Sequence, residues 1–292
     1  MATQFEQITK LAAKHKRTKT PKRQGMVVWR GKAEYDNAID IVVVATPPGT
    51  NRKLGPKMWT LWIMLEHIHP MDAVKSGADY AVCGNCPLRP SIAEKLKAMG
   101  IDASKCYVNV GREVGRIWEC FKRGGYQETT PADFAVIIRN FSARIGGHGD
   151  GGAVPVHIIK QILGYDPLTG QCDIETYTNY SHGWTTPGWN PEHLDIAMVS
   201  LDRQSIADYP GEFAALPANA RTYRVLGSDE PIPGKRASEV LCPNYSKAVQ
   251  CGDCGLCAGS LQAKSIVAPD HGPGSAYRNA QVAAAKAAKK AA

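Results

Sequence analysis

Four cysteines lie between Cys242 and Cys257, a span of sixteen residues, and such clustering is typical of a metal or disulfide site. The last three, Cys251, Cys254 and Cys257, follow a Cys-x2-Cys-x2-Cys pattern, and Cys242 precedes a proline. Iron-sulfur clusters use thiolate ligands of these types and spacings. Zinc accepts the same four thiolates, usually as two Cys-x2-Cys pairs, but here one gap is eight residues. The pattern predicts an iron-sulfur cluster, with zinc as the alternative.

A second group consists of Cys83, Cys86 and Cys106, with no fourth cysteine nearby. Three protein ligands would leave one coordination position open, as a reactive cluster or a catalytic metal requires. The alternative is a closed zinc site completed by His67, by His69 or by a cysteine of the C-terminal group. The sequence leaves both alternatives open. It predicts a second metal in either case.

The segment from Gly146 to Gly152 reads Gly-Gly-His-Gly-Asp-Gly-Gly, between a predicted strand and a predicted helix. Backbone N-H groups of such a loop can bind an anion, although the loop lacks the Lys-Ser or Lys-Thr ending of a nucleotide-binding P-loop. The segment from Tyr177 to Trp184 follows another predicted strand and could line the same opening. The predicted cofactor-binding residues are Gly146, Gly147 and Gly149, and the predicted catalytic residues are His148 and Asp150.

Short apolar runs alternate with helical segments over most of the chain, which indicates an α/β protein with a parallel sheet. We expect a partial or complete β/α barrel with a C-terminal cysteine-rich metal module. The predicted strands are 39–45, 59–65, 106–110, 142–145, 174–179, 197–200, 222–226 and 265–269. The predicted helices are 112–123, one that begins at Pro131, 155–163 and 206–216.

The expected organisation has four parts. Residues 1–35 form a basic arm, 36–240 the barrel-like domain, 241–275 the cysteine-rich module and 276–292 an Ala/Lys-rich tail. The formal charge of +8 is concentrated at the two ends. Basic ends can contact the phosphates of a nucleic acid, but they can equally serve solubility alone. The small-molecule or macromolecular substrate is not indicated.

The sequence predicts a cytoplasmic protein with no membrane partner. No apolar run approaches the roughly 20 residues that span a bilayer, and the N-terminus lacks the basic start and apolar stretch of a secretory signal. In a reducing compartment, clustered cysteines more often bind metal than form disulfides, and the total of nine cysteines is odd. Cys120 and Cys172, which lie outside both groups, are predicted to be ordinary buried thiols.

These motifs together resemble an uncharacterised family of phage and prophage proteins. The matching segments are 51–55, 82–89, 106–111, 144–150, 177–184 and 251–257, with His271 and Gly272. Leu54 and Gly151 stand where that family has threonine and proline. The resemblance implies a phage-encoded protein in the host cytoplasm.

That family is distantly similar to radical S-adenosylmethionine proteins, in which three cysteines hold a cluster whose free iron binds the cofactor. The likeness implies S-adenosylmethionine as a cofactor and a radical or redox reaction at Cys83, Cys86 and Cys106. This sequence departs from the usual Cys-x3-Cys-x2-Cys pattern, because nineteen residues separate Cys86 from Cys106. The alternative is a zinc-stabilised protein that binds nucleic acid or builds a phage structure.

Overall fold

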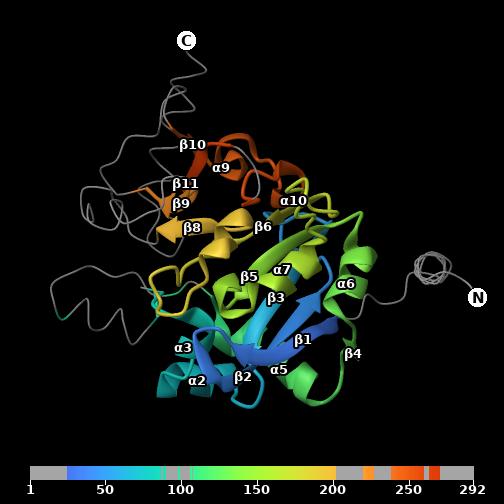
Figure 1. Ribbon diagram of the computed structural model, residues 1–292, viewed down its shortest axis with the longest axis vertical. Helices are drawn as coiled ribbons and strands as arrows, with labels where there is room; N and C mark the ends of the chain where they lie inside the picture. Colours follow the sequence, from blue (N-terminus) through green and yellow to red (C-terminus); the bar gives the residue numbers. More distant parts are fainter. Residues whose placement is uncertain are drawn as a thin grey trace, which may run out of the picture.

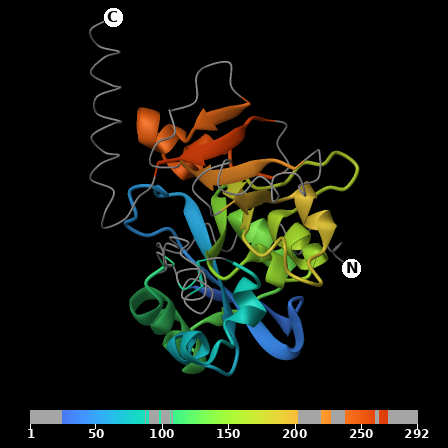
Figure 2. The ribbon, with the colours of Figure 1, turned by 90° about the vertical axis from the view of Figure 1, so that its left-hand side faces the viewer.

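The chain forms two β-sheets flanked by helices in the computed structural model, which describes residues 25–86, 88–89, 98, 106, 108–201, 220–226, 238–259 and 263–269. Six strands form one sheet in the order β4-β1-β2-β3-β5-β6, and five form the other in the order β10-β11-β9-β8-β7. Figure 1 shows the first sheet in blue to green and the second in yellow to red, and Figure 2 shows the same two parts after a quarter turn.

The first sheet consists of β1 (Met26–Ala33), β2 (Asp36–Thr46), β3 (Met58–Leu65), β4 (Gln127–Glu128), β5 (Ser142–His148) and β6 (Thr176–Thr178). The second consists of β7 (Tyr180–Ser181), β8 (Met198–Leu201), β9 (Thr222–Val225), β10 (Glu239–Leu241) and β11 (Ser265–Ala268). The α-helices are α2 (Pro70–Ser76), α3 (Tyr80–Cys83), α5 (Gly115–Lys122), α6 (Pro131–Ile138), α7 (Val156–Leu163), α9 (Pro243–Lys247) and α10 (Cys251–Cys254). Shorter helical turns are η1 (Val110–Val114), η2 (Gly151–Ala153) and η3 (Pro191–Asp195).

The first sheet is buried on both faces, because successive side chains of a strand point to opposite sides. In β2, Ile41 and Val43 belong to the apolar cluster that includes α6 and α7, whereas Val42 and Val44 pack in the cluster that includes α5. Every residue of β3 is buried. Apolar residues on both faces of β2 and β3 thus produce a three-layer arrangement of helix, sheet and helix.

The two sheets are joined through one stretch of chain, because only Asn179 separates β6 from β7. The strands β3, β5 and β6 are parallel to one another, and so are all five strands of the second sheet. The segments that follow β3, β5 and β7 therefore leave from the same side of the molecule. Parallel α/β proteins place their sites at this carboxyl edge.

The structure confirms a mixed α/β fold with mostly parallel strands, but it does not show a barrel. The parallel order is interrupted because β1, β2 and β3 are antiparallel neighbours. Residues 26–33, which the sequence analysis placed in the basic arm, form β1 instead. A separate cysteine-rich module is not confirmed either, since β10 and β11 pair within the second sheet.

Most predicted strands and helices have a counterpart in the fold. The runs 39–45 and 59–65 are within β2 and β3, and the helix predicted to begin at Pro131 is α6. The strand predicted over 106–110 is wrong, because the described residues of this stretch are not in a strand and Val110 begins the helical turn η1. The predicted helix 206–216, residues 1–24 and the tail lie outside the described residues. No helix of the described part combines the length and apolar character needed to cross a membrane.

Candidate metal centres

The four C-terminal cysteines line one small pocket, which borders one face of the second sheet. Cys242 follows β10, Cys251 and Cys254 lie on α10, and Cys257 lies in the turn after it. Cys242 and Cys257 are buried, and the other two are half-buried. The remaining wall includes Tyr180, Tyr223 and Lys53.

Backbone hydrogen bonds dock this cysteine segment onto the rest of the fold. The N-H groups of Cys251 and Gly252 donate to the carbonyls of Lys53 and Leu54 at 2.8 and 3.0 Å. The Ser142 hydroxyl donates to the carbonyl of Gly252 at 2.9 Å. Residues 51–55, a segment of the predicted family resemblance, thus form the surface that positions α10.

The turn that carries Cys257 is held by a single guanidinium. Arg221 donates to the carbonyl oxygens of Leu256, Ala258, Ala263 and Lys264 at distances of 2.7 to 3.0 Å. The four accepting residues lie outside helices and strands, and each contact is a charge-assisted hydrogen bond. Arg221 therefore fixes the geometry of the turn.

Burial favours the protonated form of three of the C-terminal thiols, those of Cys242, Cys251 and Cys257. It raises the pKa of Cys257 to about 12 and also raises the pKa values of Cys242 and Cys251. The neighbouring thiols raise them further, whereas the Lys53 ammonium lowers those of Cys242 and Cys251. A metal must displace these protons to bind. Lys53 favours the charged thiolates of Cys242 and Cys251, and Arg144 adds to this effect at Cys251.

The other predicted group also shares one pocket, at the carboxyl edge of the parallel strands. Cys83, Cys86 and Cys106 line it together with His148 and further residues, and its volume is about 50 Å³. Cys83 ends α3, and the Cys106 N-H donates to the Leu88 carbonyl at 3.0 Å. This contact brings Cys106 to the turn that carries Cys86.

A buried ion pair fixes the loop between Cys83 and Cys86. Arg89 binds the Asp79 carboxylate through Nε and Nη2 at 3.0 and 2.6 Å, with side chains 8% and 5% exposed. Its guanidinium also donates to the carbonyls of Gly77 and Gly84 at 2.9 and 3.2 Å. Burial raises the pKa of Cys83 well above the usual thiol value, and the Asp79 charge adds to this effect.

Asp150 lines this pocket, but its carboxylate is already occupied by other hydrogen bonds. One oxygen accepts from the Gly152 N-H at 2.7 Å, and the other accepts from the N-H groups of His182 and Gly183. Burial raises the pKa of Asp150, and these hydrogen bonds oppose the rise. The contacts tie β5 to the segment after β7, so Asp150 positions the pocket wall.

Backbone geometry accounts for the glycines predicted to bind a cofactor. Gly146 and Gly149 line the pocket and have φ angles of +75° and +76°. Gly147 lies within β5, where an added Cβ would come within 2.4 Å of the Thr60 side chain. These positions require glycine for conformation and close packing. Cofactor binding by these glycines stays a prediction.

The side chains as placed do not form a finished ion site. Within the described part of the chain, no group of three or more His, Cys, Asp or Glu residues is arranged so that it could hold a metal ion. The donor chemistry suits a metal, because several thiols face each pocket. Binding at either group would require the side chains to turn toward a shared centre.

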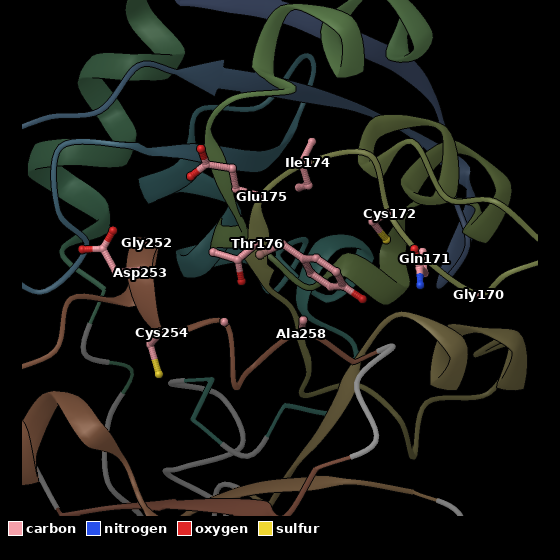
Figure 3. A pocket seen from close by; sticks show the side chains of 12 residues that line it. Gly170, Gln171, Cys172, Ile174, Glu175, Thr176, Gly252, Asp253, Cys254 and Ala258 are labelled. Atoms are coloured by element: carbon pink, nitrogen blue, oxygen red, sulfur yellow. The ribbon is translucent and has the colours of Figure 1, made fainter.

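A larger cavity of about 550 Å³ adjoins the C-terminal group. Figure 3 shows Glu175 and Thr176 on one side and Asp253 and Cys254 of α10 on another. Cys254 lines both this cavity and the pocket of the four thiols. Small-molecule sites commonly have volumes of about 300 to 1,000 Å³. The cavity therefore gives molecules from solvent a route to the edge of the cysteine group.

The structure brings together the residues of each predicted cysteine group and places His148 and Asp150 beside the first. Lys53 and Arg221 were not assigned to either centre from the sequence, because only tertiary contacts connect them with the cysteines. The segment from Tyr177 to Trp184 was predicted to line the opening of the glycine loop, and its His182 does line the first pocket. Cys120 and Cys172 were predicted to be buried, but both are half-buried. Comparisons with protein-family models, with curated proteins and with solved structures give no significant match.

Proposed function

We propose that this chain is a metalloprotein whose residues Cys242, Cys251, Cys254 and Cys257 hold an iron-sulfur cluster. The observation that carries the proposal is that four thiols, from the end of β10, α10 and the following turn, line one pocket. Thiolate spacing favours a cluster over zinc. The Ser142 and Arg221 contacts support it further, because they hold the ligand segments in place.

An iron-sulfur cluster is also compatible with the arrangement of these four thiols, which do not converge on one point. A cluster of several atoms lies between its ligands, so its thiolates stand further apart than those of a single zinc ion. The space among the side chains is about 20 Å³, so cluster binding requires the side chains that line the pocket to move apart. Lys53 would offset part of the negative charge of the thiolates.

The cavity beside Cys254 supports a role in which the cluster exchanges electrons with a soluble partner. Its walls expose one edge of the cysteine group to solvent. A cluster that only braced the fold would need no such access. We therefore propose a redox role for the C-terminal centre.

For the first group, we propose a second metal at Cys83, Cys86 and Cys106. The pocket of about 50 Å³ is far smaller than the roughly 300 to 1,000 Å³ of sites for organic ligands. Its size favours an ion over S-adenosylmethionine. The phage origin, the host-cytoplasm location and nucleic-acid binding by the basic ends remain predictions, because residues 1–24 and 270–292 lie outside the described part.

Metal analysis of protein purified without oxygen tests the proposal. We expect iron with acid-labile sulfide, about four of each per chain for a cubane cluster. The double variant Cys251→Ser, Cys254→Ser should lose both. The matched control, Cys120→Ser with Cys172→Ser, removes two thiols outside both groups. This control should retain both the iron and the sulfide. Zinc without sulfide in the unmodified protein would refute the cluster.

A further inference from the structure

Cys83, Cys86 and Cys106 supply three ligands, and the pocket that they line identifies a fourth. Neither histidine that the sequence suggested lines this pocket. His69 caps α2, because its Nδ1 accepts from the Met71 N-H at 3.3 Å, and its ring packs edge-on against Trp118. His67 is exposed to solvent.

His148 has the position that a fourth ligand requires. It is the last residue of β5, it is 7% exposed, and it lines the pocket with the three cysteines. Within the described part of the chain, its imidazole has no hydrogen bond. Its ring nitrogens are not sealed within the core, so a metal ion in the pocket could reach them.

The other polar groups in the pocket are less suited to the role. Both carboxylate oxygens of Asp150 accept hydrogen bonds from backbone N-H groups. His182 is only half-buried, so water can reach its side chain. His148 is thus the pocket residue best placed to act as a further ligand, because it lines the pocket with the three cysteines and no hydrogen bond within the described part of the chain uses its imidazole.

We propose that Cys83, Cys86, Cys106 and His148 together form a closed Cys3His site for a single tetrahedral metal ion of the zinc class. Neutral imidazole and thiolate are the ligands that zinc prefers in structural sites. A volume of about 50 Å³ accommodates an ion, and the thiols and imidazole must rotate toward it. The inference rests on the proposed second metal and adds that no coordination position is left for a substrate.

The site would connect three segments that are distant in sequence. Cys83 and Cys86 flank the turn after α3, Cys106 comes twenty residues after Cys86 in the sequence, and His148 ends β5. The Arg89 contacts with the carbonyls of Gly77 and Gly84 already hold the first of these segments. A metal would add a cross-link between the loop after β3 and the end of β5.

Cobalt titration of the metal-depleted, reduced full chain tests the inference. Tetrahedral cobalt bound to thiolate has visible bands that report the ligand set. His148→Ala should weaken cobalt binding at this site by at least about 100-fold, since even outer-shell changes cost 10- to 100-fold. His148→Cys should retain binding and strengthen the thiolate charge-transfer band. The control His157→Ala, on an exposed position of α7, should match the unmodified protein.

The possible outcomes separate this inference from the proposed metal itself. If Cys86→Ser abolishes cobalt binding at this site and His148→Ala changes neither affinity nor spectrum, His148 is not a ligand. If Cys86→Ser also has no effect, the second metal is wrong. Should His148→Ala fail to fold, the spectrum of His148→Cys decides: an unchanged charge-transfer intensity overturns the proposal.

Discussion

The buried pair of Asp79 and Arg89 permits a quantitative test of how the first cysteine group is positioned. Asp79→Ala leaves the Arg89 charge buried without its carboxylate, and removal of one partner of such a pair costs about 3 to 5 kcal/mol. The side chains are only 8% and 5% exposed, so water cannot readily replace the lost contact. We therefore expect a loss of about 3 to 5 kcal/mol in the free energy of unfolding.

Replacing both partners should restore much of this stability. In Asp79→Leu with Arg89→Met, no buried charge remains, and the main cost is the donors lost by the carbonyls of Gly77 and Gly84. Each unsatisfied carbonyl costs about 1 kcal/mol at the low end, so we expect a net loss of about 2 kcal/mol.

Urea unfolding followed by circular dichroism measures the free energy of unfolding of both variants. The single and double variants should also bind metal more weakly at Cys83 and Cys86, while the C-terminal group is unaffected. An Asp79→Ala variant that loses less than about 1 kcal/mol would refute the reasoning, because that loss is typical of exposed pairs. A double variant less stable than Asp79→Ala would contradict the assigned cause.

Three further changes test other parts of the structure. Gly149→Ala should lower the free energy of unfolding in urea by about 2 to 5 kcal/mol, because φ is +76° and the new Cβ would lie 2.6 Å from a backbone oxygen of β3. The control Gly77→Ala, with φ of +82° and open space around the new Cβ, should cost about 1 to 2 kcal/mol. Equal costs for the two variants would contradict the role of this close contact. Burial lowers the pKa of His193 to about 4, below its usual 6.5, so its stabilising effect is complete above pH 6.5 and is lost as the pH falls to about 4. The variant His193→Phe should remove about 3 kcal/mol of that pH dependence, and an unchanged stability curve between pH 4 and 6.5 would count against a neutral buried imidazole. Ser142→Ala should cost about 1 kcal/mol and increase amide exchange in α10, because the hydroxyl donates to the Gly252 carbonyl; unchanged exchange would mean that this contact does not hold α10.

The sequence predicted the elements whose apolar pattern is local. β2 contains the apolar run Ile41–Ala45, β3 is apolar apart from Thr60, and α6 begins at a proline after the threonine that caps it. It could not predict β1, because the basic residues before it suggested an extension of the charged arm. Antiparallel pairing of β1 with β2 depends on a turn at Glu34 and Tyr35 that carries no glycine or proline.

In the candidate sites, too, features that are local in sequence could be predicted and features that depend on distant segments could not. Cysteine spacing was enough to predict two groups, because ligands of one site tend to be close in sequence. The neighbours of those groups come from distant segments: Arg221 reaches the turn of Cys257, and His148 reaches the pocket of Cys83. The glycines around His148 have conformational or packing reasons of their own, since Gly146 and Gly149 have positive φ angles and Gly147 and Gly149 pack against β3; cofactor binding by them stays a prediction.

Anomalous diffraction at the iron absorption edge, from crystals of anaerobically purified protein, tests the central claim most directly. The account predicts an iron signal in the pocket lined by Cys242, Cys251, Cys254 and Cys257. An anomalous signal there only at the zinc edge, or a fully occupied iron signal elsewhere with these four thiols free, would contradict it.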